Sequence, residues 1–266
     1  IVIQSTHKTL PAFTQSSMVH VGTDRVDIEK LERMMSVYQT TSPSYLLLSS
    51  IDYAVGYMNE YGNQELDRVL DKIEKITTHL EKLENVKIFN KKNICNNNFH
   101  DFDSTKLLFK IEGITGKRLE DILRKDYKIQ LEMSDYYYGL AIVSALDEDS
   151  DLEKLATAIE DISKKSEYLN ESLEINEFKD IRNIYPKIEM PLYEAFYNDK
   201  ISVQLNESIG KISGDFVIPY PPGVPILASG EVITSDIVSY INELKKNNIE
   251  ILGLTEDNKN IFILEK

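Results

Sequence analysis

The most constraining feature of the sequence is a regular alternation of hydrophobic patterns between residues 86 and 169. Short β-branched and aromatic stretches, which are typical of strands, are separated by segments with apolar residues every third or fourth position, which are typical of helices. The alternation predicts strands at residues 86–89, 105–112, 130–133 and 136–145, and helices at residues 119–125 and 151–169. Because such elements pack in layers around one core, we expect an α+β unit in a chain of mixed α/β class.

The first forty residues predict two strands and a helix. Residues 1–4 are apolar and β-branched, so we expect a short buried strand there, and residues 16–21 are expected to form a second strand. A helix reaching about Gln39 follows, and either Asp24 or Asp27 can cap its N-terminus.

Two further helices are expected on either side of Gly62. The first, at residues 44–61, begins just after Pro43 and is apolar almost all round, so we expect it to be well buried. The second, at residues 64–83, is more polar and has a single apolar stripe. Because the chain opens at Ile1 inside a strand pattern and without Met, we expect it to be the C-terminal part of a longer protein.

The C-terminal part of the sequence is richer in proline and predicts fewer regular elements. Four of the eight prolines lie at residues 219–225. A helix is expected at residues 234–246, and residues 249–254 and 261–264 are expected to pair as a closing hairpin. We therefore predict three domains, at residues 1–58, 59–175 and 176–266.

Composition excludes several classes of function. Lys and Arg total 30 against 44 Asp and Glu, and this net charge of −14 argues against a surface that binds nucleic acid or anionic membranes. No apolar run approaches the roughly 18–20 residues that a membrane helix needs. With Cys95 as the only cysteine and four histidines, we expect no internal disulfide, no metal site and a reducing, cytoplasmic location.

The most reactive combination of side chains follows the first strand, where Ser5, Thr6, His7 and Lys8 are consecutive. Burial disfavours a charged ammonium, and a neutral lysine amine can form a Schiff base with an aldehyde. Hydroxyl and imidazole groups can donate hydrogen bonds to a phosphate, so the set suits pyridoxal phosphate, which has both groups. From these residues alone, the alternative is that Lys8 is an ordinary exposed loop lysine.

Three segments, in the same order, resemble the Orn/Lys/Arg decarboxylase family of fold-type I pyridoxal-phosphate enzymes. Residues 5–20 (STHKTLPAFTQSSMVH) resemble the segment that carries the cofactor lysine. Residues 40–45 (TTSPSY) resemble the Thr-Ser-Pro stretch, and residues 219–225 (PYPPGVP) resemble the Tyr-Pro-Pro-Gly-Ile/Val-Pro signature. The resemblance runs through essentially the whole chain but covers only the second part of the family's architecture.

The resemblance implies both a fold and a cofactor site. The fold would be the remnant of a fold-type I large domain, an aminotransferase-like α+β small domain and a C-terminal α+β domain. Lys8 would link covalently to pyridoxal phosphate, and Ser5 and His7 would contact its phosphate. Thr40 would reach the phosphate of a partner subunit, because family sites form at the interface of a homodimer or higher homo-oligomer. Lys8 and His7 would also be the catalytic residues that handle protons.

The implied reaction is decarboxylation of arginine, lysine or ornithine, which releases CO2 and a polyamine or its precursor. Glu231 falls at the end of the family's Pro-Gly-Glu, with Ser229 in place of the proline, and a substrate-side role is implied for it. The family's ring-stacking histidine and the aspartate that pairs with the pyridine nitrogen lie upstream of the lysine. We therefore expect an N-terminal half as a partner, and we expect this chain alone to be inactive, without covalently bound cofactor.

Two other hypotheses stay open. The chain could be a non-catalytic dimerisation and folding module of a split or proteolysed enzyme, in which large apolar surface favours association. Alternatively, the fold type could be retained with another reaction, such as that of an aminotransferase or a carbon–sulfur lyase. The segment at residues 220–223 argues against this third hypothesis, because the resemblance there is to the decarboxylases.

Overall fold

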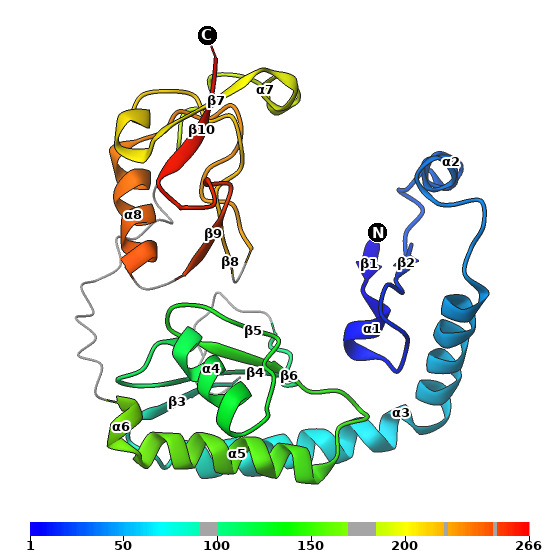
Figure 1. Cartoon of the computed structure of the whole chain (residues 1–266). Helices are drawn as coiled ribbons and strands as arrows, with labels where there is room; N and C mark the ends of the chain where they lie inside the picture. The colour runs from blue at the N-terminus through cyan, green and yellow to red at the C-terminus, as the bar shows by residue number, and fades with distance from the viewer. Residues whose placement is uncertain (91–100, 170–184, 221–222, 247–248, 266) are drawn as a thin grey trace. The chain divides into compact units, whose positions relative to one another are not determined.

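The structure is a computed structural model that describes residues 1–90, 101–169, 185–220, 223–246 and 249–265 (Figure 1). The chain divides into two units, each with its own internal contacts. The first unit contains residues 1–112, 122–132 and 140–169. The second unit contains residues 113–121 and 133–139 together with the C-terminal part of the chain. The predicted mixed α/β class is confirmed.

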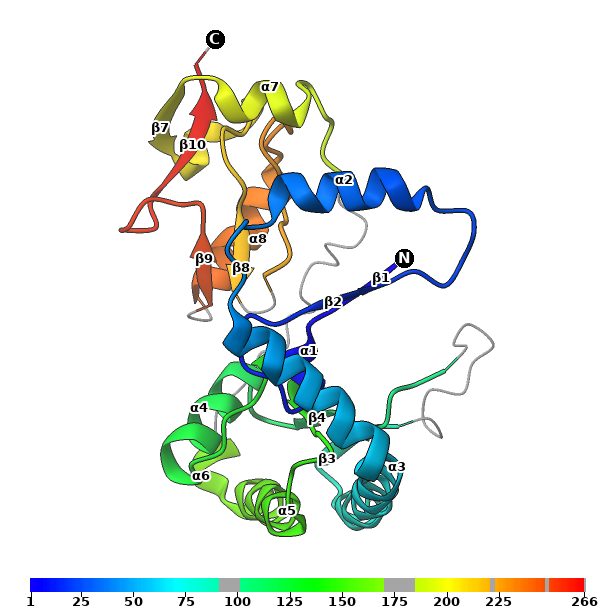
Figure 2. The ribbon, with the colours of Figure 1, turned by 90° about the vertical axis from the view of Figure 1, so that its right-hand side faces the viewer.

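The chain begins with a small antiparallel hairpin. Its strands are β1 (Val2–Gln4) and β2 (Met18–His20), with Val2 opposite His20, and the one-turn helix α1 (Thr6–Thr9) lies in the connection between them (Figure 2). Both predicted strands are confirmed, but the burial predicted for the first is wrong, because Ile3 is 75% exposed. The sheet has only these two strands among the described residues, so no neighbouring strand covers it.

Helix α2 (Ile28–Tyr38) follows the hairpin and has the predicted capping residue. The Asp27 carboxylate accepts a hydrogen bond from the backbone amide of Lys30 at 2.9 Å, which satisfies one of the amides left free at a helix start. The helix nevertheless has no buried residue.

The two helices predicted on either side of Gly62 are one helix, α3 (Tyr45–Leu80), 36 residues long. Glycine costs a helix only about 1 kcal/mol relative to alanine, so an isolated glycine does not end a helix that gains packing elsewhere. The burial predicted for residues 44–61 is also wrong: Tyr45 is 79% exposed, and Ala54 is the only buried residue of this stretch.

A four-stranded sheet follows, with the strand order β3-β4-β6-β5. The strands are β3 (Val86–Phe89), β4 (Lys106–Ile111), β5 (Met133–Ser134) and β6 (Gly139–Ile142). Three of the predicted strands are confirmed, although β6 is shorter than the predicted residues 136–145; the strand predicted at residues 130–133 is wrong, because only Met133 of it lies in a strand, β5. β3 and β4 are antiparallel, with Val86 opposite Ile111. Residues 91–100, between these two strands, lie outside the described residues.

The predicted helices of this region are also present. They are α4 (Gly116–Asp126), α5 (Asp149–Lys164) and α6 (Ser166–Leu169). The helix predicted over residues 151–169 is interrupted at Lys165, and its N-cap is Glu148, whose side chain forms a reciprocal capping box with Asp151.

The core of the first unit lies between the sheet, the second half of α3 and α5. Figures 1 and 2 both show α5 running alongside this half of α3. The two helices are parallel, because three side-chain pairs between them have the same sequence separation of 81 residues: Arg68–Asp149, Lys72–Glu153 and His79–Glu160. The buried apolar side chains are Val69, Ile73, Ile76 and Leu80 of α3, Leu152, Leu155, Ile159 and Ile162 of α5, and Val86, Ile88, Leu107, Phe109 and Ile111 of the sheet.

The second unit has a separate core around one helix. Its elements are α7 (Leu192–Tyr197), β7 (Lys200–Gln204), the 3-10 helix η2 (Leu205–Ser208), β8 (Ile218–Tyr220), α8 (Ser235–Lys246), β9 (Glu250–Leu252) and β10 (Asn260–Leu264). The core residues are Leu205, Val217, Leu227, Ile233, Ile237, Val238, Ile241, Leu244, Ile251, Ile261 and Ile263. The helix predicted at residues 234–246 is confirmed.

The closing hairpin predicted from residues 249–254 and 261–264 is wrong. β9 pairs with β8 and β10 pairs with β7, both antiparallel, and the two segments share only the isolated bridge between Leu254 and Ile261. Gly253 explains the separation: its φ of +89° turns the chain out of β9, and a Cβ at this position would collide with the carbonyl of Phe216.

Candidate functional site

Three of the predicted site residues lie together in α1. Ser5 is the residue at the N-cap of this turn, and His7 and Lys8 are inside it. The Lys8 amide donates to the Ser5 carbonyl at 3.1 Å, and the Leu10 amide donates to the Thr6 carbonyl at 2.9 Å, which closes the turn. Ser5, His7 and Lys8 therefore project from a single turn between the two strands of the hairpin.

Ser16 ties this turn to the start of β2. Its carbonyl accepts a hydrogen bond from the Thr6 amide at 3.1 Å and from Nδ1 of His7 at 2.9 Å. Because a carbonyl can only accept, Nδ1 of His7 carries the proton, and Nε2 of the neutral ring is then an acceptor. The geometry thus orients the imidazole and leaves Nε2 for a further contact.

Two buried hydroxyl groups lie in the same corner. Thr6 is 1% exposed and Ser16 is 2% exposed, and neither Oγ1 of Thr6 nor Oγ of Ser16 has a hydrogen-bond partner among the described residues. A buried polar group without a partner costs about 1–3 kcal/mol, so native proteins seldom leave one unsatisfied. Sequence reasoning missed both groups, because nothing in the sequence distinguishes these hydroxyls from exposed ones.

The Lys8 amine has a carboxylate partner from a distant part of the same unit. Nζ of Lys8 donates to Oε1 of Glu132 at 2.8 Å across a sequence separation of 124 residues. The ion pair is accessible to water, because the Lys8 side chain is 51% exposed and that of Glu132 is 31% exposed. The sequence analysis also missed Glu132, which falls in a predicted strand and has no motif around it.

Thr40 lies apart from this turn in the sequence and in its contacts. It is exposed in the segment between α2 and α3, and its hydroxyl accepts a hydrogen bond from the Ser42 amide at 3.2 Å. This bond stabilises the turn that precedes α3. The cross-subunit role predicted for Thr40 stays a prediction, because it concerns a second subunit.

Glu231 belongs to the second unit and forms part of a tight turn. Its Oε2 accepts from the Ala228 amide at 2.7 Å, and its own amide donates to the Ala228 carbonyl at 3.2 Å. Gly230 has a φ of +91° in this turn, and a Cβ there would collide with the carbonyl of Met190. Glu231 therefore has a structural contact, and its substrate-side role stays a prediction. Part of the proline signature, residues 221–222, lies outside the described residues.

The α1 corner has the chemistry that could hold pyridoxal phosphate. Lys8 offers an amine for an aldehyde, and Ser5 and His7 offer polar groups for a phosphate. The unsatisfied hydroxyls of Thr6 and Ser16 are an independent observation, because a phosphate oxygen or a bound water would accept their hydrogen bonds. The residues present therefore fit the group.

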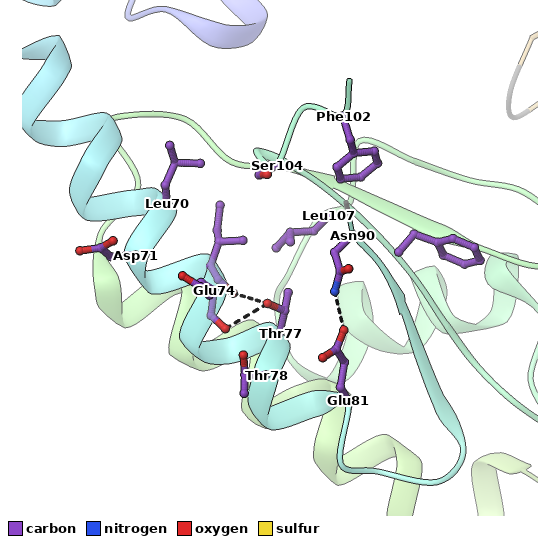
Figure 3. Close-up of a pocket in the computed structure, with 12 residues that line it drawn as sticks. Leu70, Asp71, Glu74, Thr77, Thr78, Glu81, Asn90, Phe102, Ser104 and Leu107 are labelled. Carbon is purple, nitrogen blue, oxygen red and sulfur yellow. Dashed lines mark hydrogen bonds between the residues drawn. The ribbon is translucent and has the colours of Figure 1, made fainter. Parts of the chain in front are cut away.

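A separate cavity in the first unit involves none of the predicted site residues. Its volume is about 270 Å³, and it lies between the second half of α3 and the adjoining ends of β3 and β4 (Figure 3). The Thr77 hydroxyl donates to the carbonyls of Ile73 and Glu74, and Asn90 donates to Glu81. These polar side chains of the lining thus already bind one another or the backbone.

The part of the chain that the structure describes contains no group of three or more His, Cys, Asp and Glu side chains placed to hold a metal ion. None of its helices combines the length and the apolar character needed to cross a membrane.

Family models match two parts of the chain. Residues 1–121 match the model described as "Orn/Lys/Arg decarboxylase, major domain", and residues 182–262 match "Orn/Lys/Arg decarboxylase, C-terminal domain". Among curated proteins, an arginine decarboxylase of Halalkalibacterium halodurans is 30% identical over 256 residues, which cover 95% of this chain and 52% of the relative. An arginine decarboxylase of Bacillus anthracis is 29% identical over 256 residues, which cover 94% and 50%.

Solved structures with the same fold come from lysine decarboxylases. The enzyme of Francisella novicida superposes with a TM-score of 0.82 at 21% identity, covering 99% of this chain and 48% of that one. The constitutive lysine decarboxylase of E. coli superposes with a TM-score of 0.79 at 18% identity, covering 99% and 49%. The chain thus spans about half the length of the relatives that it matches.

Proposed function

Because the chain belongs to the Orn/Lys/Arg decarboxylase family, we propose that it takes part in the decarboxylation of a basic amino acid with pyridoxal phosphate bound through Lys8. One observation carries the proposal: Ser5, His7 and Lys8 project from a single helical turn, within the residues that match the family's major domain. The names of the relatives support arginine or lysine as the substrate, and ornithine is the third member of the same chemical class.

Three residues in and beside α1, namely Lys8, Ser5 and His7, each have a proposed role. Lys8 supplies the amine for the covalent linkage, and Ser5 donates a hydrogen bond to the phosphate. His7, fixed through Nδ1 by the Ser16 carbonyl, presents Nε2 as an acceptor, which suits a residue that takes up or returns a proton. A phosphate contact through the same nitrogen requires the charged form of the ring.

The cofactor supplies one part of the chemistry when bound, an electron sink for the pair left behind when CO2 departs. The protein's share is positioning and proton transfer. The residues around α1 would act through orientation, by holding the substrate so that its carboxylate can depart as CO2. Once the substrate amine has displaced Lys8, the Lys8 amine or His7 can return a proton to the α-carbon.

We extend the proposal to the remaining predicted contacts and domains. Thr40 would donate to the phosphate in a second subunit of a homodimer or higher homo-oligomer, and Glu231 would act on the substrate side. The fold would combine a fold-type I remnant at residues 1–58, an aminotransferase-like domain at 59–175 and a C-terminal domain at 176–266. The family match and the likeness to lysine decarboxylases support this description.

We also propose that the 266-residue polypeptide by itself is inactive. A Schiff base needs the neutral amine, whereas Lys8 is half exposed and paired with a carboxylate, and both conditions favour the ammonium. A second candidate function, a non-catalytic association module, is favoured by the apolar side chains that residues 1–61 expose.

The test is a cofactor-trapping experiment with a paired activity assay. The polypeptide is incubated with excess pyridoxal phosphate, reduced with borohydride and digested, and the labelled peptide is identified by mass spectrometry. The proposal expects any lysine label to be on Lys8 and expects Lys8→Ala to lose it. Measurable release of CO2 from arginine, lysine or ornithine by Lys8→Ala would contradict the role of Lys8. Substantial release by the unmodified 266-residue polypeptide would contradict its inactivity.

A further inference from the structure

Glu132 is placed on Lys8 by the backbone around it. The Glu132 amide donates to the Leu140 carbonyl at 3.0 Å, which fixes this residue beside the start of β6. From that position the side chain reaches Nζ of Lys8 at 2.8 Å. The Lys8 backbone is in turn fixed by its bond to the Ser5 carbonyl. Both ends of the ion pair are thus attached to hydrogen-bonded backbone.

The charge state of Lys8 decides whether it can react. In the linkage proposed above, the nitrogen lone pair forms a bond to the aldehyde carbon, the carbonyl oxygen leaves as water, and the two protons of the neutral amine leave with it. An ammonium has no lone pair, so it must first give a proton to a base. A carboxylate at hydrogen-bond distance favours the ammonium over the neutral amine.

We propose that Glu132 is a positioning residue that holds the Lys8 amine in its charged, unreactive form until the cofactor displaces this contact. The inference rests on the proposed function of Lys8 and assigns a role to a residue outside the family-like motifs.

The expected size of the effect of Glu132 on linkage at Lys8 follows from the exposure of both side chains to water. Because water reaches both side chains, the pair resembles surface ion pairs, which shift an equilibrium by only about 1.5- to 5-fold. The distance beyond which salt largely screens exposed charges falls from about 10 Å at 0.1 M ionic strength to about 3 Å at 1 M, so the pair is weaker at high salt. The effect should therefore be small, dependent on salt and confined to pH values at which a lysine is charged.

The experiment compares Glu132→Gln with the wild type and with two further variants. Glu132→Asp keeps the charge on a shorter side chain, and Glu153→Gln removes an equivalent charge from the partner of Lys72 in the same unit. For each protein, the equilibrium for linkage of pyridoxal phosphate is measured by absorbance from pH 7 to pH 11, at 0.1 M and 1 M salt. Borohydride trapping and peptide mass spectrometry establish the fraction of label on Lys8.

Glu132→Gln is expected to increase linkage at Lys8 about 1.5- to 5-fold at pH 7 and 0.1 M salt. The increase should shrink at 1 M salt and should also shrink toward pH 11, where a growing part of the amine is neutral in every variant. Glu132→Asp should lie between the wild type and Glu132→Gln, and Glu153→Gln should match the wild type.

Linkage in Glu132→Gln equal to or weaker than in the wild type, or an equal increase in Glu153→Gln, would overturn the role of Glu132 while leaving that of Lys8 intact. Absence of label on Lys8 in all four proteins, at every pH, would overturn this inference, whereas it would agree with the expectation that the polypeptide alone carries no covalently bound cofactor.

Discussion

Residues 1–61 and residues 62–169 both carry many large apolar side chains, but they differ in what those side chains contact. In the first region, the only buried residues are Thr6, Ser16 and Ala54. In the second region, α3, α5 and the sheet bury their apolar faces against one another. The difference shows that an apolar sequence measures the capacity for burial, whereas burial itself needs a second surface of matching shape.

Helix α3 makes the comparison within one element. Its second half buries Val69 and Leu80, whereas the first half exposes a set of large apolar side chains, Tyr45, Leu46, Leu48, Tyr53, Val55 and Tyr61. The first half of α3 therefore exposes apolar side chains to solvent, whereas the second half belongs to the core of the first unit.

The sharpest way to break the comparison is to remove one large apolar side chain from each region. Phe109 is 1% exposed, and Phe109→Ala is expected to lower the free energy of unfolding by about 3–5 kcal/mol, because it leaves a cavity in the sheet. Leu46 is 66% exposed, and Leu46→Ala is expected to change the free energy of unfolding by less than about 0.5 kcal/mol. Urea titration followed by circular dichroism at low protein concentration measures both.

Repeating the Leu46→Ala titration at high protein concentration supplies the control. A cost for Leu46→Ala that approaches that of Phe109→Ala even at low concentration would mean that the first half of α3 is buried after all. The contrast between the two regions would then be wrong.

A second comparison concerns arginine. Arg68 donates to Glu65 at 2.8 Å, to Asp149 at 2.6 Å and to the Asp147 carbonyl at 2.9 Å, so it connects α3 to the start of α5. Arg68→Met is expected to cost about 1–2 kcal/mol, because charged hydrogen bonds are lost at a site that water partly reaches. The same change at Arg25, in the first region, should cost less than about 0.5 kcal/mol. Equal losses of unfolding free energy for the Met variants of Arg68 and Arg25, measured by urea titration, would contradict this prediction.

A third prediction tests whether the first region unfolds independently of the core. Asp27→Ala removes the N-cap of α2 and is expected to cost about 1 kcal/mol locally. Because α2 has no buried residue, its amides should exchange about fivefold faster while the urea midpoint stays unchanged. Hydrogen exchange with mass spectrometry measures the first effect, and Asp24→Ala is the matched control. A shift of the global midpoint in Asp27→Ala would show that α2 is coupled to the core.

The smallest expected effect is a pH dependence of the urea midpoint that arises in residues 62–169. Hydrogen bonds from the Lys165 amine and then from the Tyr127 hydroxyl hold the pKa of Asp161 below its ordinary value of 3.8. A carboxyl group with a lowered pKa in the folded state contributes its stability above that ordinary value and loses it as the pH falls through the folded pKa. Asp161→Asn should therefore weaken the decrease in urea midpoint between pH 5 and about pH 2.5. Identical decreases in the two proteins would contradict this contribution.

The sequence predicted those elements whose pattern is local. Leu107, Phe109 and Ile111 alternate along β4 with a period of two, and a strand that buries one face encodes that period directly. The continuity of α3 through Gly62 could not be predicted, because packing further along the helix outweighs the weak helix propensity of glycine. The pairing of β9 with β8 depends on Gly253 and on strands distant in the sequence, so the short turn predicted a hairpin instead.

The candidate site likewise contains residues that the sequence could predict and residues that it could not. Ser5, His7 and Lys8 are consecutive or nearly so, and one turn of helix is enough to place them together. Glu132 lies 124 residues from Lys8, and only the folded unit brings the two side chains into contact. The sequence likewise could not reveal that the hydroxyls of Thr6 and Ser16 are buried, because burial depends on the turn itself.

The length of α3 has a mechanical consequence. At 1.5 Å per residue its 36 residues follow a helix axis about 54 Å long, of which the exposed half is about 26 Å, and Figure 1 shows that this axis bends along its length. The buried half packs against the sheet, whereas the exposed half extends beyond it and is contacted there by the N-terminal segment, in which the Phe13 amide donates to Oγ of Ser50 at 3.2 Å. A bend of about 5° at Gly62 would displace the free end by about 2 Å, which is comparable to a hydrogen-bond length. A surface seated on that end is therefore set at a distance and angle that the core dictates, and small changes in the curvature of the helix would be magnified there.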